Sequence, residues 1–205
     1  MLKTVIARQF RRPAGVLGFL ASKIMDKGNL KAIEWVFSLL NIGDNEKILE
    51  IGYGSGILIN KLAMHNNTIR IFGVDFSKVM FVRAKKRNYT FINKRKVTLS
   101  CGSVLDYQPQ VLFDKIIAIN VVYFWDDLAK YSNKLYQMLN NNGKLYLYLA
   151  DPEDLAKIKF TATNIFNKYT PESVIEKMKS IPFKSVKYEK RTTNDVKAYC
   201  IIAEK

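Results

Sequence analysis

Short apolar runs alternate with amphipathic stretches through the middle of the chain. The apolar runs cover residues 47–51, 68–74, 97–101, 115–122 and 144–150. Runs that are apolar throughout are typical of strands buried on both faces of a parallel sheet. The stretches between them favour helices over residues 55–64, 77–88 and 126–139. This alternation predicts a parallel sheet covered by helices on both sides.

The first 45 residues follow a different pattern from the centre of the chain. Apolar residues recur at helical spacing over Gly15–Met25 and again over Leu30–Leu40. Gly28–Asn29 lies between these two stretches, and such a pair is typical of a break between helices. We therefore expect an N-terminal helical segment over residues 1–45, which forms either a lid over the site or an ordinary helical pair packed on the sheet.

The last part of the chain predicts an antiparallel hairpin. Two strand-like runs, Ser185–Arg191 and Val196–Ala203, flank the turn-rich segment Thr192–Asp195. With the five central runs, they give a doubly wound α/β fold of three layers. Its sheet has seven strands and is mostly parallel, with an antiparallel C-terminal hairpin. Residues 46–205 are expected to form this single domain, to which the N-terminal segment is added.

Capping residues mark several predicted helix ends. Ser77 and Asp126 stand where N-caps are expected. Asp151–Pro152 and Thr170–Pro171 each place a capping side chain before a proline suited to a first helical turn. Asn142–Gly143 predicts a helix stop before the fifth strand.

A glycine-rich turn directly follows the first strand. Its sequence is Glu50-Ile51-Gly52-Tyr53-Gly54-Ser55-Gly56. Ligands of open α/β sheets bind beyond the carboxyl ends of the strands, where glycine allows the backbone to approach closely. The spacing G-x-G-x-G differs from the G-x-G-x-x-G of dinucleotide enzymes. The added carboxylate of Glu50 suits a ligand with a positively charged amino-acid end better than a pyrophosphate.

A second carboxylate ends the next strand, in Phe72-Gly73-Val74-Asp75. A carboxylate at this place can accept hydrogen bonds from both hydroxyls of a ribose. Asp75 could instead serve only to start the following helix. Paired with the glycine-rich turn, it favours a nucleoside ligand.

These motifs resemble those of class I, Rossmann-like S-adenosylmethionine (SAM)-dependent methyltransferases, in order, over residues 46–150. Further similar segments are Cys101–Val104, Phe113–Ile116 and Asn120–Tyr123. Segments 12–15 and 25–29 also resemble a branch of small bacterial methyltransferases. The resemblance implies a methyl transfer from SAM, with S-adenosylhomocysteine (SAH) as product. The acceptor is not identified.

The resemblance also implies a set of cofactor-binding residues. They are Glu50, Gly52, Tyr53, Gly54, Gly56, Asp75, Phe76, Ser103, Val104 and Asn120. The three glycines and Glu50 would hold the methionine part, with Asn120 near them. Asp75 would take the ribose, while Phe76 and Val104 would contact the adenine. Ser103 stands where many relatives carry aspartate, which weakens charge assistance at the adenine.

The acceptor side is less defined by sequence. Tyr123, Asn29 and Arg12 are the candidate substrate-contacting residues, because Tyr123 follows the fourth strand and the other two lie in the lid segment. No general base is identified. His65 is the only histidine, and it is expected at the far end of a helix.

Composition adds constraints on partners and location. The formal net charge is +15, from 33 basic and 18 acidic residues among 205. This charge is consistent with nucleic acid or an anionic membrane surface as a partner, with steering of an anionic substrate, or with lysine-rich coding alone. We expect a cytoplasmic protein without bound metal. Cys101 and Cys200 are expected to be reduced core thiols.

Three functions remain open from the sequence. The leading one is a methyltransferase for a small molecule, since the chain is short and aromatic residues follow the fourth strand. The second is a methyltransferase that acts on RNA or lipid, as the positive charge would allow. The third is a non-catalytic module that binds SAM or SAH, because a fold does not establish activity.

Overall fold

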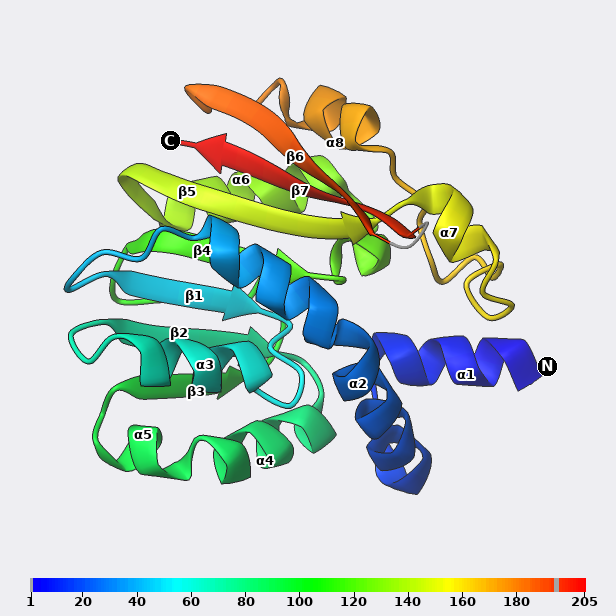
Figure 1. The fold of residues 1–205 in the computed structure, drawn as a ribbon, viewed down its shortest axis with the longest axis horizontal. Coiled ribbons are helices and arrows are strands. Elements are labelled where there is room, and N and C mark those ends of the chain that lie inside the picture. The colour runs from blue at the N-terminus through cyan, green and yellow to red at the C-terminus, as the bar shows by residue number, and fades with distance from the viewer. Residues whose placement is uncertain (1, 194–195) are drawn as a thin grey trace.

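One seven-stranded sheet forms the centre of the computed structural model, which describes residues 2–193 and 196–205 (Figure 1). The strand order is β3-β2-β1-β4-β5-β7-β6. The parallel strands are β1 (Lys47–Ile51), β2 (Arg70–Asp75), β3 (Val97–Cys101), β4 (Phe113–Ile119) and β5 (Leu139–Ala150). The C-terminal hairpin consists of β6 (Ser185–Thr193) and β7 (Val196–Glu204), and β7 pairs antiparallel with both β5 and β6. The predicted fold class is confirmed, although residues 194–195 of the predicted turn lie outside the described residues.

Helices cover both faces of this sheet (Figure 1). One face carries α2 (Gly15–Leu39), α3 (Ile57–His65), α4 (Lys78–Arg87) and α5 (Tyr89–Asn93). The other carries α6 (Leu128–Met138) and α8 (Pro171–Met178). In β1, Ile48 packs into the first of these cores and Leu49 into the second. Successive strand residues point to opposite faces, so a strand buried on both sides has to be apolar throughout.

The strand order places a binding crevice near the middle of the sheet. From β1 the chain proceeds outward through β2 to β3, whereas β4 lies on the other side of β1. Ligands of open α/β sheets bind where the direction of winding reverses in this way. Several short elements lie at this carboxyl edge. They are α1 (Leu2–Arg11), α7 (Pro152–Ala156) and the 3₁₀ turn Val122–Phe124. The start of α2 lies beside α1 there (Figure 1).

Three of the predicted N-caps are confirmed and one is displaced. The side chains of Ser77, Asp151 and Thr170 each accept a hydrogen bond from a backbone N–H in the helix that follows. Asp126 is not the cap of α6. Asp127 takes that place and accepts from the backbone N–H of Lys130, because the chain turns into the helix one residue later than expected.

The predicted break at Gly28–Asn29 is wrong, since α2 runs without interruption for 25 residues. A glycine inside a helix costs only about 1 kcal/mol, which tertiary contacts can offset. Asn29 makes such a contact, because its Oδ1 accepts a hydrogen bond from the side-chain amide of Asn120 at 3.0 Å. Among the described residues, neither α2 nor any other helix combines the length and apolar character needed to cross a membrane.

The predicted helix stop at Asn142–Gly143 is also wrong. Helix α6 ends at Met138, and both residues lie inside β5, near an irregularity in its pairing with β4. Asn142 adopts a positive φ of 63° there. A Cβ atom on Gly143 would lie 2.9 Å from the carbonyl oxygen of Phe113, so close backbone approach accounts for this glycine.

Candidate active site

The glycine-rich turn leaves β1 in a left-handed backbone conformation. Gly52 has a φ of +67°, and a Cβ atom added there would lie 2.4 Å from Cγ1 of Val121. Gly54 has a φ of +53°, and its missing side chain leaves open space within 4 Å. Glycine is the residue that adopts this conformation without strain. The turn therefore presents bare backbone at the carboxyl edge of the sheet.

Gly56 has a different place from the other two glycines. It precedes α3 and faces α4, where Asn88 donates a side-chain hydrogen bond to its carbonyl oxygen at 3.1 Å. The structure does not place Gly56 among the residues that line the cavity described below. Its contribution is to let α4 pack closely against the turn.

Two buried carboxylates flank this turn. Glu50 is 4% exposed, and its Oε2 atom has no hydrogen-bond partner among the described residues. Burial raises the pKa of Glu50 well above its usual value, and the nearby Asp75 carboxylate raises it further. An unpartnered buried carboxylate oxygen is costly unless a cation or donor meets it. Glu50 is therefore a candidate for binding a cationic ligand group.

Asp75 is held by backbone groups on either side of it. Its Oδ2 accepts from the N–H of Gly54 at 2.9 Å, and its Oδ1 accepts from the N–H of Ser77 at 2.8 Å. Burial raises the pKa of Asp75 to about 6, and these two hydrogen bonds oppose that rise. Each carboxylate oxygen has two lone pairs, so Asp75 keeps acceptor capacity for a ligand.

These residues line one cavity of about 900 Å³. Of the predicted cofactor-binding residues, it contains Glu50, Gly52, Tyr53, Gly54, Asp75, Phe76, Ser103, Val104 and Asn120. We refer to this side of the cavity, formed by the ends of β1 to β4, as the strand-end wall. Its volume lies in the range of roughly 300–1,000 Å³ found for small-molecule sites.

The predicted adenine-binding residues lie together at the end of β3 and β2. Phe76 is half-buried on the cavity, and the guanidinium carbon of Arg12 lies 5.5 Å from the centre of its ring. Arg12 itself does not line the cavity, whereas Arg11 does. The hydroxyl of Ser103 accepts from the backbone N–H of Leu105 at 3.2 Å and remains beside the cavity.

Tyr123 and Asn29 are joined through Asn120, which has a φ of +58° at the end of β4. The Tyr123 hydroxyl donates to Oδ1 of Asn120 at 3.0 Å and accepts from the backbone N–H of Ala150. The side-chain amide of Asn120 donates to Asn29. Tyr123 is buried, and its burial raises the pKa of its hydroxyl. The hydroxyl therefore acts here as a fixed hydrogen-bonding group.

The rest of the cavity is mostly apolar and is formed by α1, α2 and the segment after α7, and local sequence patterns did not indicate the part after α7. We call it the helical wall and define it by Phe10, Ile24, Met25, Phe160 and Phe166. The rings of Phe10 and Phe160 lie 4.3 Å apart, and those of Phe160 and Phe166 lie 5.9 Å apart. The first of these contacts joins residues 150 positions apart along the chain, so no local pattern indicates it.

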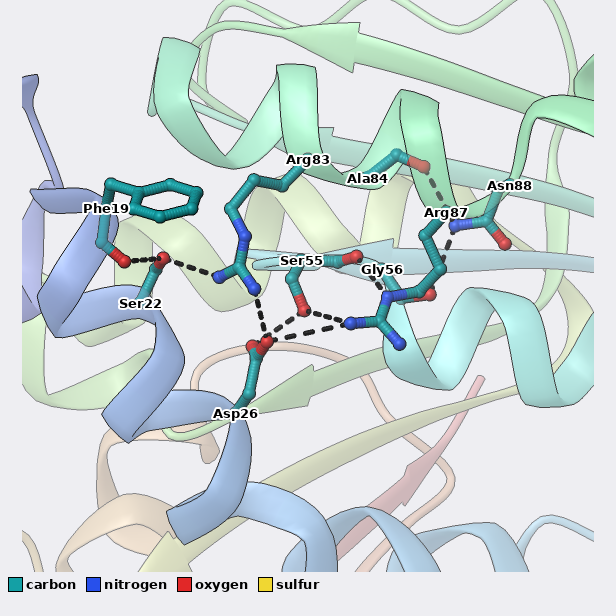
Figure 2. A network of polar contacts seen from close by, with 9 residues as sticks. All are labelled: Phe19, Ser22, Asp26, Ser55, Gly56, Arg83, Ala84, Arg87 and Asn88. Atoms are coloured by element: carbon teal, nitrogen blue, oxygen red, sulfur yellow. Dashed lines mark hydrogen bonds and ion pairs between the residues drawn. The ribbon is translucent and has the colours of Figure 1, made fainter.

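A polar network connects α2 to the glycine-rich turn and to α4 (Figure 2). Oδ1 of Asp26 accepts from the hydroxyl of Ser55 at 2.6 Å, and its Oδ2 accepts from Arg83 at 2.7 Å. Arg87 donates to the backbone oxygen of Ser55 at 2.9 Å and lies 3.6 Å from Asp26. Arg83 also donates to Ser22 on α2. Asp26 thus fixes α2 against the turn.

Other sequence candidates lie outside the cavity. His65 ends α3, where its ring packs edge-on against Phe37 at 5.1 Å, as expected. Cys200 is buried, which raises the pKa of its thiol to about 12. The expectation of a core thiol is wrong for Cys101, which is exposed because it lies at the end of β3, near the edge of the sheet.

Comparison with known proteins agrees with this geometry. Residues 49–145 match a family model described as a methyltransferase domain. An uncharacterized methyltransferase, YdaC of Bacillus subtilis (strain 168), is 28% identical over 126 residues, which is 61% of this chain and 67% of that protein. The malonyl-[acyl-carrier protein] O-methyltransferase of Priestia megaterium is 32% identical over 98 residues, 48% of this chain but only 34% of that protein.

A solved structure extends the likeness over most of the fold. The N-methyltransferase NodS from Bradyrhizobium japonicum WM9, in complex with SAH, matches with a TM-score of 0.66 at 19% identity. The match covers 85% of each chain. With the strand order, this similarity shows that the chain has the seven-stranded, Rossmann-like fold of that methyltransferase, and residues 49–145 of it match the methyltransferase-domain model.

Proposed function

We propose that this protein binds SAM and transfers its methyl group to a small, largely apolar acceptor. The observation that carries the proposal is the unpartnered, buried Oε2 of Glu50, which lines the cavity beside the bare backbone of the glycine-rich turn. An ammonium group offers the charge and the hydrogen-bond donors that this oxygen lacks. The residues present therefore fit the amino-acid end of SAM.

The remaining strand-end residues would hold the nucleoside. Asp75 keeps lone pairs for the two ribose hydroxyls after accepting from Gly54 and Ser77. Phe76 offers a flat ring for the adenine, and the buried Val104 adds an apolar surface for it in the same cavity. Gly52 and Gly54 leave room for the methionine part to lie against the main chain.

When bound, SAM would supply an electrophilic methyl group on its sulfonium. The task left to the protein is to orient an acceptor in line with it, which can contribute about 7–11 kcal/mol of rate enhancement. Asn120 and Asn29 both line the cavity, and the hydrogen bond between their side chains holds them in one arrangement. The Tyr123 hydroxyl is already bonded on both sides, so we assign it to positioning rather than to proton transfer.

The helical wall supports an apolar acceptor of small size. Its residues are aromatic and aliphatic, and they line the same cavity as the proposed cofactor site. The named relatives differ in their acceptor atom, one being an O-methyltransferase and another an N-methyltransferase. We further propose that residues 1–45 act as a lid that excludes water, a step common in enzymes with buried cofactors.

Calorimetric titration with SAM and SAH tests the cofactor assignment. We expect saturable binding by the wild type and at least a roughly tenfold loss with Asp75→Ala, because charge-assisted hydrogen bonds to the ribose are removed. Asp106→Ala is the matched control, since that exposed carboxylate lies outside the cavity. Equal binding by both variants, or no binding by the wild type, would refute the assignment.

Glu50→Gln separates ligand binding from folding. The neutral amide is expected to weaken SAM binding while raising the melting temperature of the free protein, since a buried unpartnered carboxylate is removed. Release of SAH over a panel of apolar amines, phenols and carboxylic acids then tests turnover. SAM binding without turnover on any acceptor would support a binding module instead.

A further inference from the structure

Large apolar side chains lie on the outward face of the first half of α2. Val16 is 78% exposed, Leu17 is 59% exposed and Leu20 is 53% exposed. Ile24, one turn further, is 65% exposed. Scattered exposed apolar residues are common on proteins, but several on consecutive turns of one helix mark an interaction site. We call Val16, Leu17, Leu20 and Ile24 the apolar part of the α2 face.

Three lysines complete this face. Lys23, Lys27 and Lys31 are spaced four residues apart, and all three are exposed. At 3.6 residues per turn, this spacing keeps them in one row beside the apolar residues. None of the ion pairs among the described residues involves them. The face is therefore both apolar and positively charged.

The opposite side of the helix fixes which way this face points. Ser22 and Asp26 turn toward α4, where Arg83 donates to both of them (Figure 2). Gly18 and Ala32 are buried on the inward side as well. Asp26, the acidic residue in this half of α2, thus has its charge compensated on the inner side. The next acidic residue of α2, Glu34, is paired with Lys61 on α3.

The charge and the side-chain types of the α2 face indicate which kind of partner binds it. A second copy of this chain would bring the same lysines against each other in a two-fold contact, which is unfavourable. Nucleic acid is bound through phosphates and through bases stacked on aromatic rings, and aliphatic side chains contribute little to either. The one exposed ring in this half of α2, Phe19, is already contacted by Lys23 and Arg83 at 5.0 and 5.6 Å. Aliphatic residues among lysines on an exposed helix suit the boundary between lipid headgroups and acyl chains.

We propose that the α2 face docks on an anionic lipid bilayer. Val16, Leu17 and Leu20 enter the headgroup region, and Lys23, Lys27 and Lys31 pair with lipid phosphates. Ile24 belongs both to this face and to the cavity wall, so docking places the cavity entrance next to the bilayer. This inference rests on the surface of α2 and does not require that methyl transfer take place.

Vesicle co-sedimentation tests the docking directly. We expect the full chain to bind vesicles of phosphatidylglycerol and phosphatidylcholine in equal parts, and to bind pure phosphatidylcholine far more weakly. The triple variant K23E/K27E/K31E is expected to weaken binding roughly 100-fold or more, since each basic residue near an anionic surface contributes several-fold. The variant V16S/L17S/L20S is expected to weaken binding at moderate salt as well, because the apolar contribution is lost.

A matched variant on another helix controls for net charge. K78E/K85E/K86E changes the charge equally on α4, at three lysines that are also exposed. It is expected to lose less than a third as much binding free energy as the α2 variant. Equal losses by the two variants would show unspecific attraction and would overturn the proposal. Absence of binding to anionic vesicles would do so as well.

Two further measurements distinguish lipid binding from dimerisation and from RNA binding. Mass determination by light scattering reports whether the chain dimerises, and filter binding to a single-stranded RNA reports on nucleic acid. A dimer or RNA complex that the α2 variants abolish would overturn the lipid assignment. Calorimetry with SAM on the same variants, without vesicles, is expected to give wild-type affinity, so failure of docking and failure of the proposed function are distinguishable.

Discussion

The two walls of the cavity are built on different physical grounds. The strand-end wall consists of main chain and buried carboxylates that adjacent parallel strands hold in register. The helical wall consists of aromatic and aliphatic side chains on α1, α2 and the segment after α7. It is tied to the sheet by a few polar contacts, such as those of Asp26 and Asn29.

This difference separates two kinds of recognition. A wall of backbone groups offers the same hydrogen-bond donors whatever side chains surround it, which suits a ligand that never changes. A wall of side chains can be altered one residue at a time without disturbing the sheet. The comparison predicts that damage to the strand-end wall costs folding and cofactor binding together, whereas damage to the helical wall is smaller and local.

The largest effect is expected from Gly52→Ala. Its Cβ would lie 2.4 Å from Cγ1 of Val121, and the residue would keep a left-handed conformation. Overpacking and backbone strain together should destabilise the protein by about 3–5 kcal/mol. Urea unfolding measures this loss. Adding Val121→Ala to this variant is expected to restore only the stability that was lost through overpacking. Full recovery of the unfolding free energy would show that the conformation of residue 52 is not strained.

A pH-dependent effect of intermediate size is expected from Asp75. Its folded-state pKa of about 6 exceeds the ordinary value of 3.8, so the folded protein binds this proton more tightly than the unfolded chain. The resulting stabilisation is fully present below pH about 4 and is lost as the pH rises to about 6, on the order of 2–3 kcal/mol. Asp75→Asn should lack this part of the pH dependence. Parallel melting curves for the two ligand-free proteins across this window would contradict the assignment.

A smaller loss of folding stability is expected when the contact between the two walls is removed. Asp26→Ala leaves Arg83 and Arg87 without their shared carboxylate and Ser55 without its acceptor. We expect a stability loss of about 1–3 kcal/mol, with weaker SAM binding because the glycine-rich turn is less well held. A double-mutant cycle with Arg83→Met measures the coupling. Additive effects of the two substitutions would mean that the network does not connect the walls.

The smallest effect is a gain in stability within the helical wall. Gly28→Ala should stabilise α2 by about 0.5–1 kcal/mol, because its Cβ would meet no atom within 4 Å. Gly18→Ala in the same helix is the control. Its Cβ would lie 2.6 Å from the backbone carbon of Pro13, so it should destabilise. Thermal unfolding of the two variants should therefore shift in opposite directions, and a shift in the same direction would contradict this view of α2.

Local sequence patterns predicted the strand-end wall well and the helical wall poorly. The limits of β1 and the cap at Ser77 follow from residues that are neighbours in the chain. The break expected at Gly28–Asn29 failed because Asn29 bonds to Asn120, far away in sequence. Asp26 and Phe160 were missed for the same reason, since their partners come from other elements and leave no periodic signal.

The exposed thiol of Cys101 makes this chain convenient for spectroscopy. Cys101 pairs with Asp75 across β3 and β2 and directly precedes the cavity-lining Gly102, whereas the other cysteine, Cys200, is buried. A maleimide dye should therefore attach at one native position without any engineered cysteine. Its emission would report ligand arrival at the neighbouring carboxylate in real time, with the natural sequence intact.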